Sequence, residues 1–111
     1  MNKFEAVILI NPDITKSNIE KQQKFFQKQI SDMKGSIVNS ENWGLRDLNT
    51  KIKNYKKAFY KYYQLEIEGK NIPAIKKNIS QNDHILRELF IKVTNHESLP
   101  TKLEIKESES I

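Results

Sequence analysis

The most constraining feature of this sequence is the run AFYKYYQLEIE at residues 58–68. Its side chains alternate in character with a period of two, which is the period of a β-strand. One face carries Phe59, Tyr63, Leu65 and Ile67, and the other carries Tyr60, Tyr62, Gln64, Glu66 and Glu68. A strand with one apolar face pairs with other strands and buries that face against a second layer. The chain is therefore expected to form a sheet with one covered face.

Three further stretches predict strands. Residues 3–10, KFEAVILI, are apolar on both faces from Ala6 onward, which indicates a central strand, and Asn11-Pro12-Asp13 ends it. Residues 36–48 alternate weakly and are polar, so they predict an irregular edge strand in which Gly44 marks a bulge or a close backbone approach. Residues 84–93, HILRELFIKV, predict a last strand with Ile85, Leu89, Ile91 and Val93 on one face, interrupted by Arg87.

Two stretches predict amphipathic helices. The first has a stripe of Ile19, Phe26, Ile30 and Met33, with Thr15 or Ser17 as alternative N-caps and Gly35 as the C-terminal cap. The second spans residues 71–80, where Pro73 suits the first turn and Ile72, Ile75 and Ile79 form the buried stripe.

The order strand, helix, strand, strand, helix, strand is that of the ferredoxin-like split βαβ arrangement (βαββαβ). The predicted fold class is therefore α+β, with a four-stranded antiparallel sheet and two helices on one face. Residues 1–93 are expected to form this single domain, and residues 94–111 a flexible, polar C-terminal tail. The predicted core is Ile8, Phe26, Ile30, Leu65, Ile67, Ile79 and Ile91.

Composition limits the chemistry. The chain has no cysteine, its two histidines are far apart, and its three glycines are isolated. Disulfides, thiolate metal sites and a glycine-rich phosphate loop are therefore excluded, and no residue set indicates an enzyme. The net charge of +5 favours an anionic partner, although a basic solvated surface accounts for it equally well. No segment resembles a signal peptide or a membrane span, so we expect a cytoplasmic protein.

Basic and aromatic residues cluster in the middle of the chain. Residues 49–57, NTKIKNYKK, are expected to form an exposed loop in which Lys51, Lys53, Lys56 and Lys57 flank Tyr55. Tyr60 and Tyr62 follow on the uncovered face of the sheet. Lysines neutralise phosphates and tyrosines stack on unpaired bases, which together favour RNA binding. The alternative is a solvated loop beside an ordinary exposed strand.

The stretch Trp43-Gly44-Leu45-Arg46 points to a family. WGLR, the lysine-rich loop, the strand at 58–68 and the opening KFEAVILINPDI together resemble the bacterial small-subunit ribosomal protein S-six family over about residues 3–93. One departure is Asn49-Thr50-Lys51, where the family usually has a proline after the second strand.

This resemblance implies a structural protein of the small ribosomal subunit that binds central-domain rRNA together with ribosomal protein S-eighteen. It implies no catalytic site, cofactor, metal, membrane or DNA contact, and a place in the cytoplasmic ribosome, with an organelle-encoded ribosome left open. The residues expected to face rRNA or the partner are Lys3, Arg46, Lys51, Lys53, Lys56, Lys57, Tyr60, Tyr62, Arg87 and Lys92. The alternative function is a regulatory or ligand-binding domain that oligomerises through its sheet.

Overall fold

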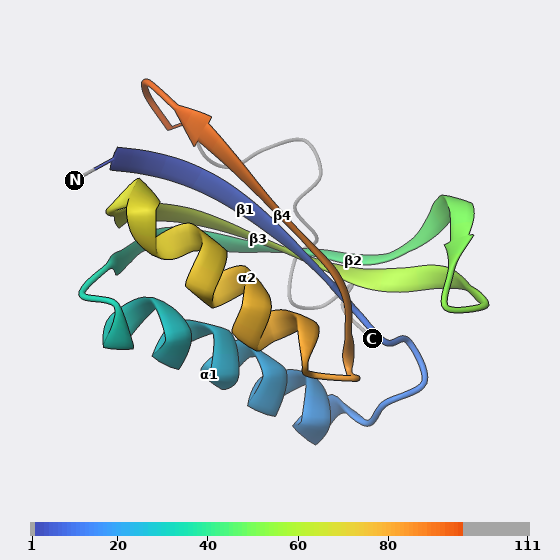
Figure 1. Cartoon of the computed structure of the whole chain (residues 1–111). Coiled ribbons are helices and arrows are strands. Elements are labelled where there is room, and N and C mark those ends of the chain that lie inside the picture. The colour runs from blue at the N-terminus through green and yellow to red at the C-terminus, as the bar shows by residue number, and fades with distance from the viewer. Residues whose placement is uncertain (1, 97–111) are drawn as a thin grey trace.

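The computed structural model describes residues 2–96 and forms two layers, a sheet and a pair of helices (Figure 1). The elements follow in the order β1 (Asn2–Ile10), α1 (Lys16–Asp32), β2 (Ser36–Ile52), β3 (Tyr55–Ile67), α2 (Ile72–Ser80) and β4 (Ile85–Val93). A short 3₁₀ turn, Gly69–Asn71, leads into α2. Most of the predicted tail, residues 97–111, lies outside the described residues.

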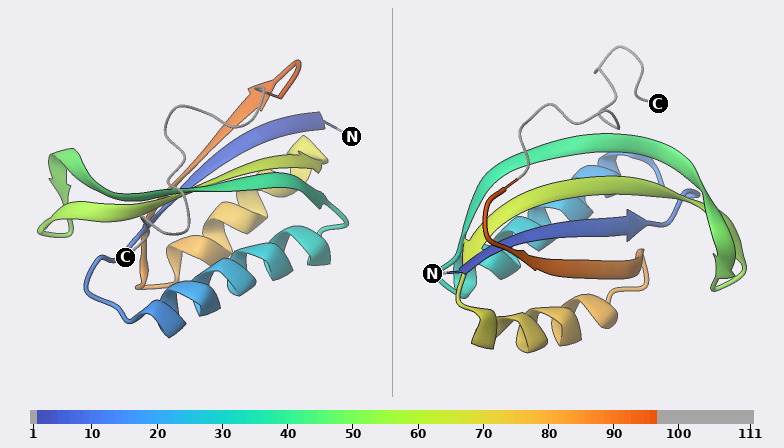
Figure 2. Two further views of the ribbon diagram at one scale, coloured as in Figure 1. Left: turned by 180° about the vertical axis from the view of Figure 1, so that it is seen from behind. Right: turned by 90° about the horizontal axis from the view of Figure 1, so that it is seen from above.

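The sheet has the strand order β2-β3-β1-β4, and every neighbouring pair is antiparallel. Central strand β1 places Ala6 opposite Tyr63 of β3 and Phe90 of β4. Both helices cover the same face of the strongly twisted sheet (Figure 2). These observations confirm the predicted α+β, ferredoxin-like fold, with β1 as a central strand and β2 as an edge strand.

The main core lies between the sheet and the helices. Phe26 of α1 is fully buried, and its ring lies 4.4 Å from that of Tyr63 and 6.1 Å from that of Phe90, measured between centroids. Six of the seven predicted core residues are buried there: Ile8, Phe26, Ile30, Leu65, Ile67 and Ile79. A smaller apolar cluster of Leu9, Ala58 and Leu86 lies apart from this core. Leu9 alternates with Ile8 and Ile10, so this second cluster is on the face opposite the helices.

The prediction for the seventh core residue, Ile91, was wrong, because its side chain is 59% exposed. The register of β4 against β1 shifts by one residue between Leu9 and Ile10, which leaves Leu86 as an extra residue. Ile85 therefore faces the helices, whereas Leu89 and Ile91 face the other way. A bulge of this kind reverses the sidedness of the residues beyond it.

Helix α1 begins at one of the two predicted N-caps, but its C-terminal end differs from the prediction. Thr15 is the N-cap, and its Oγ1 accepts a hydrogen bond from the amide of Asn18 at 3.3 Å. At the C-terminal end, Gly35 was predicted to take the left-handed capping conformation. Lys34 takes it instead, with a φ of 61°. The amides of Lys34 and Gly35 donate to the carbonyls of Ser31 and Ile30, which is a Schellman motif. Gly35 is required for space instead, because a Cβ there would lie 2.8 Å from the side chain of Ile67.

The expected loop at 49–57 is mostly strand. β2 runs to Ile52, β3 begins at Tyr55, and the two residues pair across a two-residue turn. The turn residues, Lys53 and Asn54, have φ values of 50° and 71°. Two consecutive positive φ values are those of a type I′ hairpin turn, whose twist matches that of the flanking strands.

Candidate RNA- and partner-binding surface

The end of the β2–β3 hairpin projects past the body of the molecule. We call residues 44–60 the hairpin arm, which Figure 1 shows extending beyond the sheet and helices. Lys51, Lys53, Lys56 and Lys57 are all exposed on it. Lys57 has an ion pair with Asp47 at 3.7 Å, and both side chains are more than half exposed, so water screens this pair. The arm thus presents a group of solvated cations at one end of the sheet.

Two sets of contacts hold the arm to the rest of the fold, and both include residues that flank its turn. The side-chain amide of Asn11, which ends β1, donates a hydrogen bond to the hydroxyl of Tyr55 at 3.1 Å. Ile52, Tyr55 and Tyr60 also pack on the small cluster around Leu9. The Asn-Pro turn and the lysine-rich stretch, far apart in sequence, are therefore neighbours.

The Trp-Gly-Leu-Arg stretch forms a bulge in the edge strand. The β2–β3 register shifts between Asn42 and Gly44, and Gly44 has a φ of 74°. Asn42 Oδ1 accepts a hydrogen bond from the Gly44 amide at 2.9 Å, which stabilises the bulge. The extra residue is Trp43, whose ring stacks on Tyr62 and so lies on the face opposite the helices. This confirms the bulge, one of the two features predicted at Gly44.

Arg46 is positioned by the same bulge. Its Nε donates a hydrogen bond to the carbonyl of Trp43 at 3.0 Å, and the side chain is half-buried. A guanidinium keeps several further N–H donors when Nε is engaged. Arg46 thus stands at the root of the arm with its planar end set by the backbone of the bulge.

A polar network covers the middle of this face. Glu41 is 2% exposed and accepts a hydrogen bond from Trp43 Nε1 at 2.9 Å. Gln64, also 2% exposed, donates to the Tyr62 hydroxyl at 3.1 Å and accepts from Asn39 at 3.5 Å. Tyr62 itself is 2% exposed, with Trp43 on its ring. Of the two tyrosines predicted to meet RNA bases, Tyr60 is therefore the more accessible.

Most of the predicted site residues fall at two ends of the sheet. Arg87 lies opposite Leu9, and Leu9 lies opposite Tyr60, so both are near the root of the arm. Lys3 and Lys92 lie at the other end, where Lys3 pairs with Val93 and Phe4 pairs with Lys92. Six residues of strand separate Lys3 from Leu9, a distance of roughly 20 Å. The fold gathers seven of the ten residues at one end, Arg46, Lys51, Lys53, Lys56, Lys57, Tyr60 and Arg87, and places Tyr62 in the middle of the sheet.

Sequence reasoning missed three residues on this face. Gln64 was placed on the uncovered face of its strand and Glu41 was not considered, yet both are buried. His96 was assigned to the tail, yet its Nε2 lies 3.2 Å from the carbonyl oxygen of Phe4 and 3.0 Å from that of Leu65. One sequence signal was available for Glu41. It lies two residues before Trp43, and residues two apart in a strand share a face, so a hydrogen bond between the two side chains could have been expected.

Within residues 2–96 no group of three or more acidic or histidine side chains is arranged to hold a metal ion. None of the helices in that part of the chain is both long enough and apolar enough to cross a membrane.

Comparison with known proteins agrees with this description. The family model described as ribosomal protein S6 matches residues 3–92. The small ribosomal subunit protein bS6 of Rickettsia felis is 36% identical over 103 residues, which cover 93% of this chain and 85% of that protein. Its counterpart in one strain of Rickettsia bellii is 35% identical over 107 residues, covering 93% and 86%.

A solved structure shares the fold. The crystal structure of 30S ribosomal protein S6 from Thermotoga maritima superposes with a TM-score of 0.77. The match covers 83% of this chain and 87% of that chain, at 20% sequence identity. At that identity the likeness supports the fold, while the family assignment comes from the sequence matches.

Proposed function

Since this chain belongs to the ribosomal protein S6 family of the small subunit, we propose that it binds central-domain rRNA together with ribosomal protein S-eighteen. The observation that carries this proposal is the hairpin arm. It brings four exposed lysines and Arg46 to one projecting end of the sheet, with Arg87 near its root. Such a group neutralises several backbone phosphates at once.

A second observation supports a protein partner beside the RNA. Leu89 is 45% exposed and Ile91 is 59% exposed, and both lie on β4, an edge strand. Together they form an apolar strip on the sheet face opposite the helices. Exposed apolar residues at a sheet edge are typical of protein contacts. We therefore assign the arm to RNA and the β4 strip to the partner protein.

The first experiment is a salt titration of binding to a central-domain rRNA fragment, with and without S-eighteen. The variant replaces Lys51, Lys53, Lys56 and Lys57 by glutamine, and its fold is checked by circular dichroism. The log-log salt slope of the variant should be smaller than that of the wild type by roughly 0.9 for each phosphate that is no longer neutralised. Identical slopes for wild type and variant would reduce the arm to a solvated connection.

A second experiment tests the competing function. Co-sedimentation with small ribosomal subunits in high salt should retain the protein if it is a stable ribosomal component. A ligand-binding domain that oligomerises through its sheet would stay in the supernatant and show concentration-dependent assembly instead.

A further inference from the structure

We propose that the helix layer is a second RNA-binding surface, which receives the phosphate backbone of an RNA duplex along the seam between α1 and α2. This surface is distinct from the hairpin arm and contains none of the residues assigned above. The proposal rests on the proposed ribosomal function for the kind of ligand, and on the helix layer itself for the site.

The first observation is the distribution of charge. Residues 16–34 contain five lysines and two acidic residues, and residues 69–81 contain three lysines and no acidic residue. These stretches therefore have a net charge of +6, which exceeds the +5 of the entire chain. All eight lysines are exposed. The helix layer thus carries a larger total net charge than the hairpin arm, where five basic residues and Asp47 give +4.

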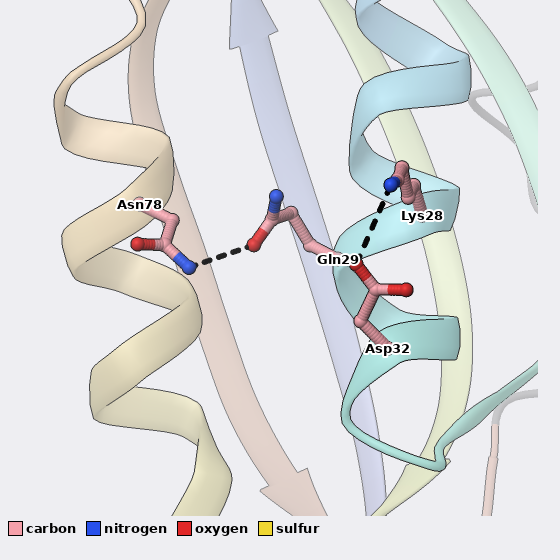
Figure 3. Close-up of polar contacts among 4 residues, drawn as sticks. All are labelled: Lys28, Gln29, Asp32 and Asn78. Carbon is pink, nitrogen blue, oxygen red and sulfur yellow. Dashed lines mark hydrogen bonds and ion pairs between the residues drawn. The ribbon is translucent and has the colours of Figure 1, made fainter.

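The second observation is the way in which the two helices are joined. Three hydrogen bonds cross the seam: Asn82 Nδ2 to Gln22 Oε1, Asn78 Nδ2 to Gln29 Oε1 at 2.9 Å, and Asn71 Nδ2 to the Met33 carbonyl at 3.2 Å. Figure 3 shows the middle bond, with Lys28 next to Gln29 on α1. These bonds fix the spacing of the two helices. All three are donated by uncharged asparagine side chains, so they add no negative charge to the seam.

Lysines stand next in sequence to the residues that make these bonds. We call them the seam lysines: Lys21, Lys28, Lys34, Lys70 and Lys77. Lys28 has an ion pair with Asp32 at 3.8 Å, and its side chain is 71% exposed. Within residues 2–96 the other four have no ion-pair partner. Lys21 and Lys34 are 13 residues apart, which places the row along roughly 20 Å of helix.

This arrangement works against the stability of the isolated protein. Lys24 lies three residues after Lys21 and four before Lys28, so like charges repel along one face of α1. Lys34 occupies a left-handed position that glycine or asparagine usually takes. A polyanion on this surface would relieve the repulsion, because the two acidic residues of α1 do not balance the lysines of the helices.

The surface favours duplex RNA over other polyanions. Among the described residues the large exposed apolar side chains are Val38, Leu45, Leu89 and Ile91, all on strands. On the helices, therefore, no large apolar side chain is fully exposed to anchor a membrane or a protein, and Phe25, the aromatic side chain next to Asn78 and Asn82, is only partly exposed. A row of point charges without a fully exposed aromatic ring suits the regular phosphates of a duplex.

The test measures binding to a short A-form RNA duplex of arbitrary sequence at increasing salt. The seam variant replaces Lys21 and Lys77 by glutamine. The matched control replaces Lys16 and Lys76, which removes the same charge from the same two helices at positions that are not next to the three bonds and not in the row of Lys21, Lys24 and Lys28. The seam variant should lose up to roughly 0.9 of log-log slope per lysine, and the control should lose clearly less.

The outcomes separate this inference from the proposed function. Equal losses for the seam variant and its control, or no loss for either, would overturn the seam as a site. Loss of binding to anionic phospholipid vesicles but not to the duplex would overturn RNA as its ligand. The variant of Lys51, Lys53, Lys56 and Lys57 is measured in parallel. If only that variant loses slope, the arm is retained and the seam rejected; if the arm variant also binds rRNA like the wild type, the proposed function fails as well.

Discussion

Trp43 lies flat on Tyr62, with ring centroids 4.8 Å apart and an interplanar angle of 10°. The bulge at Gly44 makes this possible, because it inserts Trp43 as an extra residue on the face that Tyr62 occupies. The indole also donates its N–H to the buried carboxylate of Glu41 at 2.9 Å. One residue of the edge strand thus covers an aromatic ring and donates a hydrogen bond to a buried carboxyl group.

Two substitutions of Trp43 separate these roles. Trp43→Phe keeps a ring on Tyr62 but removes the donor to Glu41, at a cost of about 1–3 kcal/mol for a buried acceptor that loses a partner. Trp43→Ala also removes the stack, which adds about 0.5–1.5 kcal/mol beyond the loss of buried apolar area. Urea denaturation of both variants measures this order. Equal midpoints for wild type and Trp43→Ala would contradict a stabilising role for the stack.

Phe26 is expected to be a major contributor to the core. Its side chain is fully buried between Tyr63 and Phe90, so Phe26→Ala should lower the free energy of unfolding by about 3–5 kcal/mol. Ile91→Ala is the control, because that side chain is 59% exposed and its loss should change stability by no more than about 0.5 kcal/mol. A denaturation midpoint unaffected by Phe26→Ala would be incompatible with the observed packing of α1.

The glycines differ in what they tolerate. A methyl group at Gly35 would meet Ile67 at 2.8 Å, and Ile67 is fully buried, so Gly35→Ala should destabilise by about 1–3 kcal/mol through overpacking. The nearest atom to a methyl group at Gly69 is Phe4 Cζ at 3.5 Å, an ordinary contact. Gly69→Ala should therefore lower the stability clearly less than Gly35→Ala, when both variants are compared with the wild type by thermal melting. The reverse order would show that Ile67 yields more easily than its burial indicates.

The sequence was informative where side chains repeat with a clear period. The order of strands and helices follows from such repeats, and so does the burial of Phe26 and Leu65. The bulge at Gly44 was predictable because a glycine inside a strand has few other uses. The exposure of the four lysines of the hairpin arm was also predicted, because a lysine-rich stretch with little apolar content stays in solvent; their role in binding stays a prediction.

The errors have one physical origin, which is that tertiary pairing overrides local signals. The face that Ile91 occupies depends on a bulge opposite Leu9 and Ile10, and nothing near Ile91 announces it. The turn at Lys53-Asn54 lacks the glycine that marks most tight hairpins, so its sequence predicts a loop where the chain forms strands. The seam lysines were not predicted as a site, because exposed lysines are common on helices. The hydrogen bonds that join α1 to α2 beside them cannot be deduced from the sequence.

Tyr63 makes the stability of the fold depend on pH in alkaline solution. Burial in the core raises the pKa of its phenol well above the usual range, because the charged phenolate is poorly solvated there. The unfolded chain releases this proton above about pH 10, whereas the folded chain keeps it. The unfolded state then binds fewer protons, so stability falls as pH rises. The contribution is complete below about pH 10 and is lost progressively above it.

The matched variant is Tyr63→Phe, which keeps the ring against Phe26 and removes the titrating group. All other side chains are the same in the two proteins, so their effect cancels in the comparison. Urea midpoints measured from neutral pH to about pH 11 should show the wild type losing stability relative to Tyr63→Phe as pH rises. A difference between the two proteins that stays constant over this range would mean that the Tyr63 hydroxyl ionises as readily in the folded state as in the unfolded one, against its position in the core.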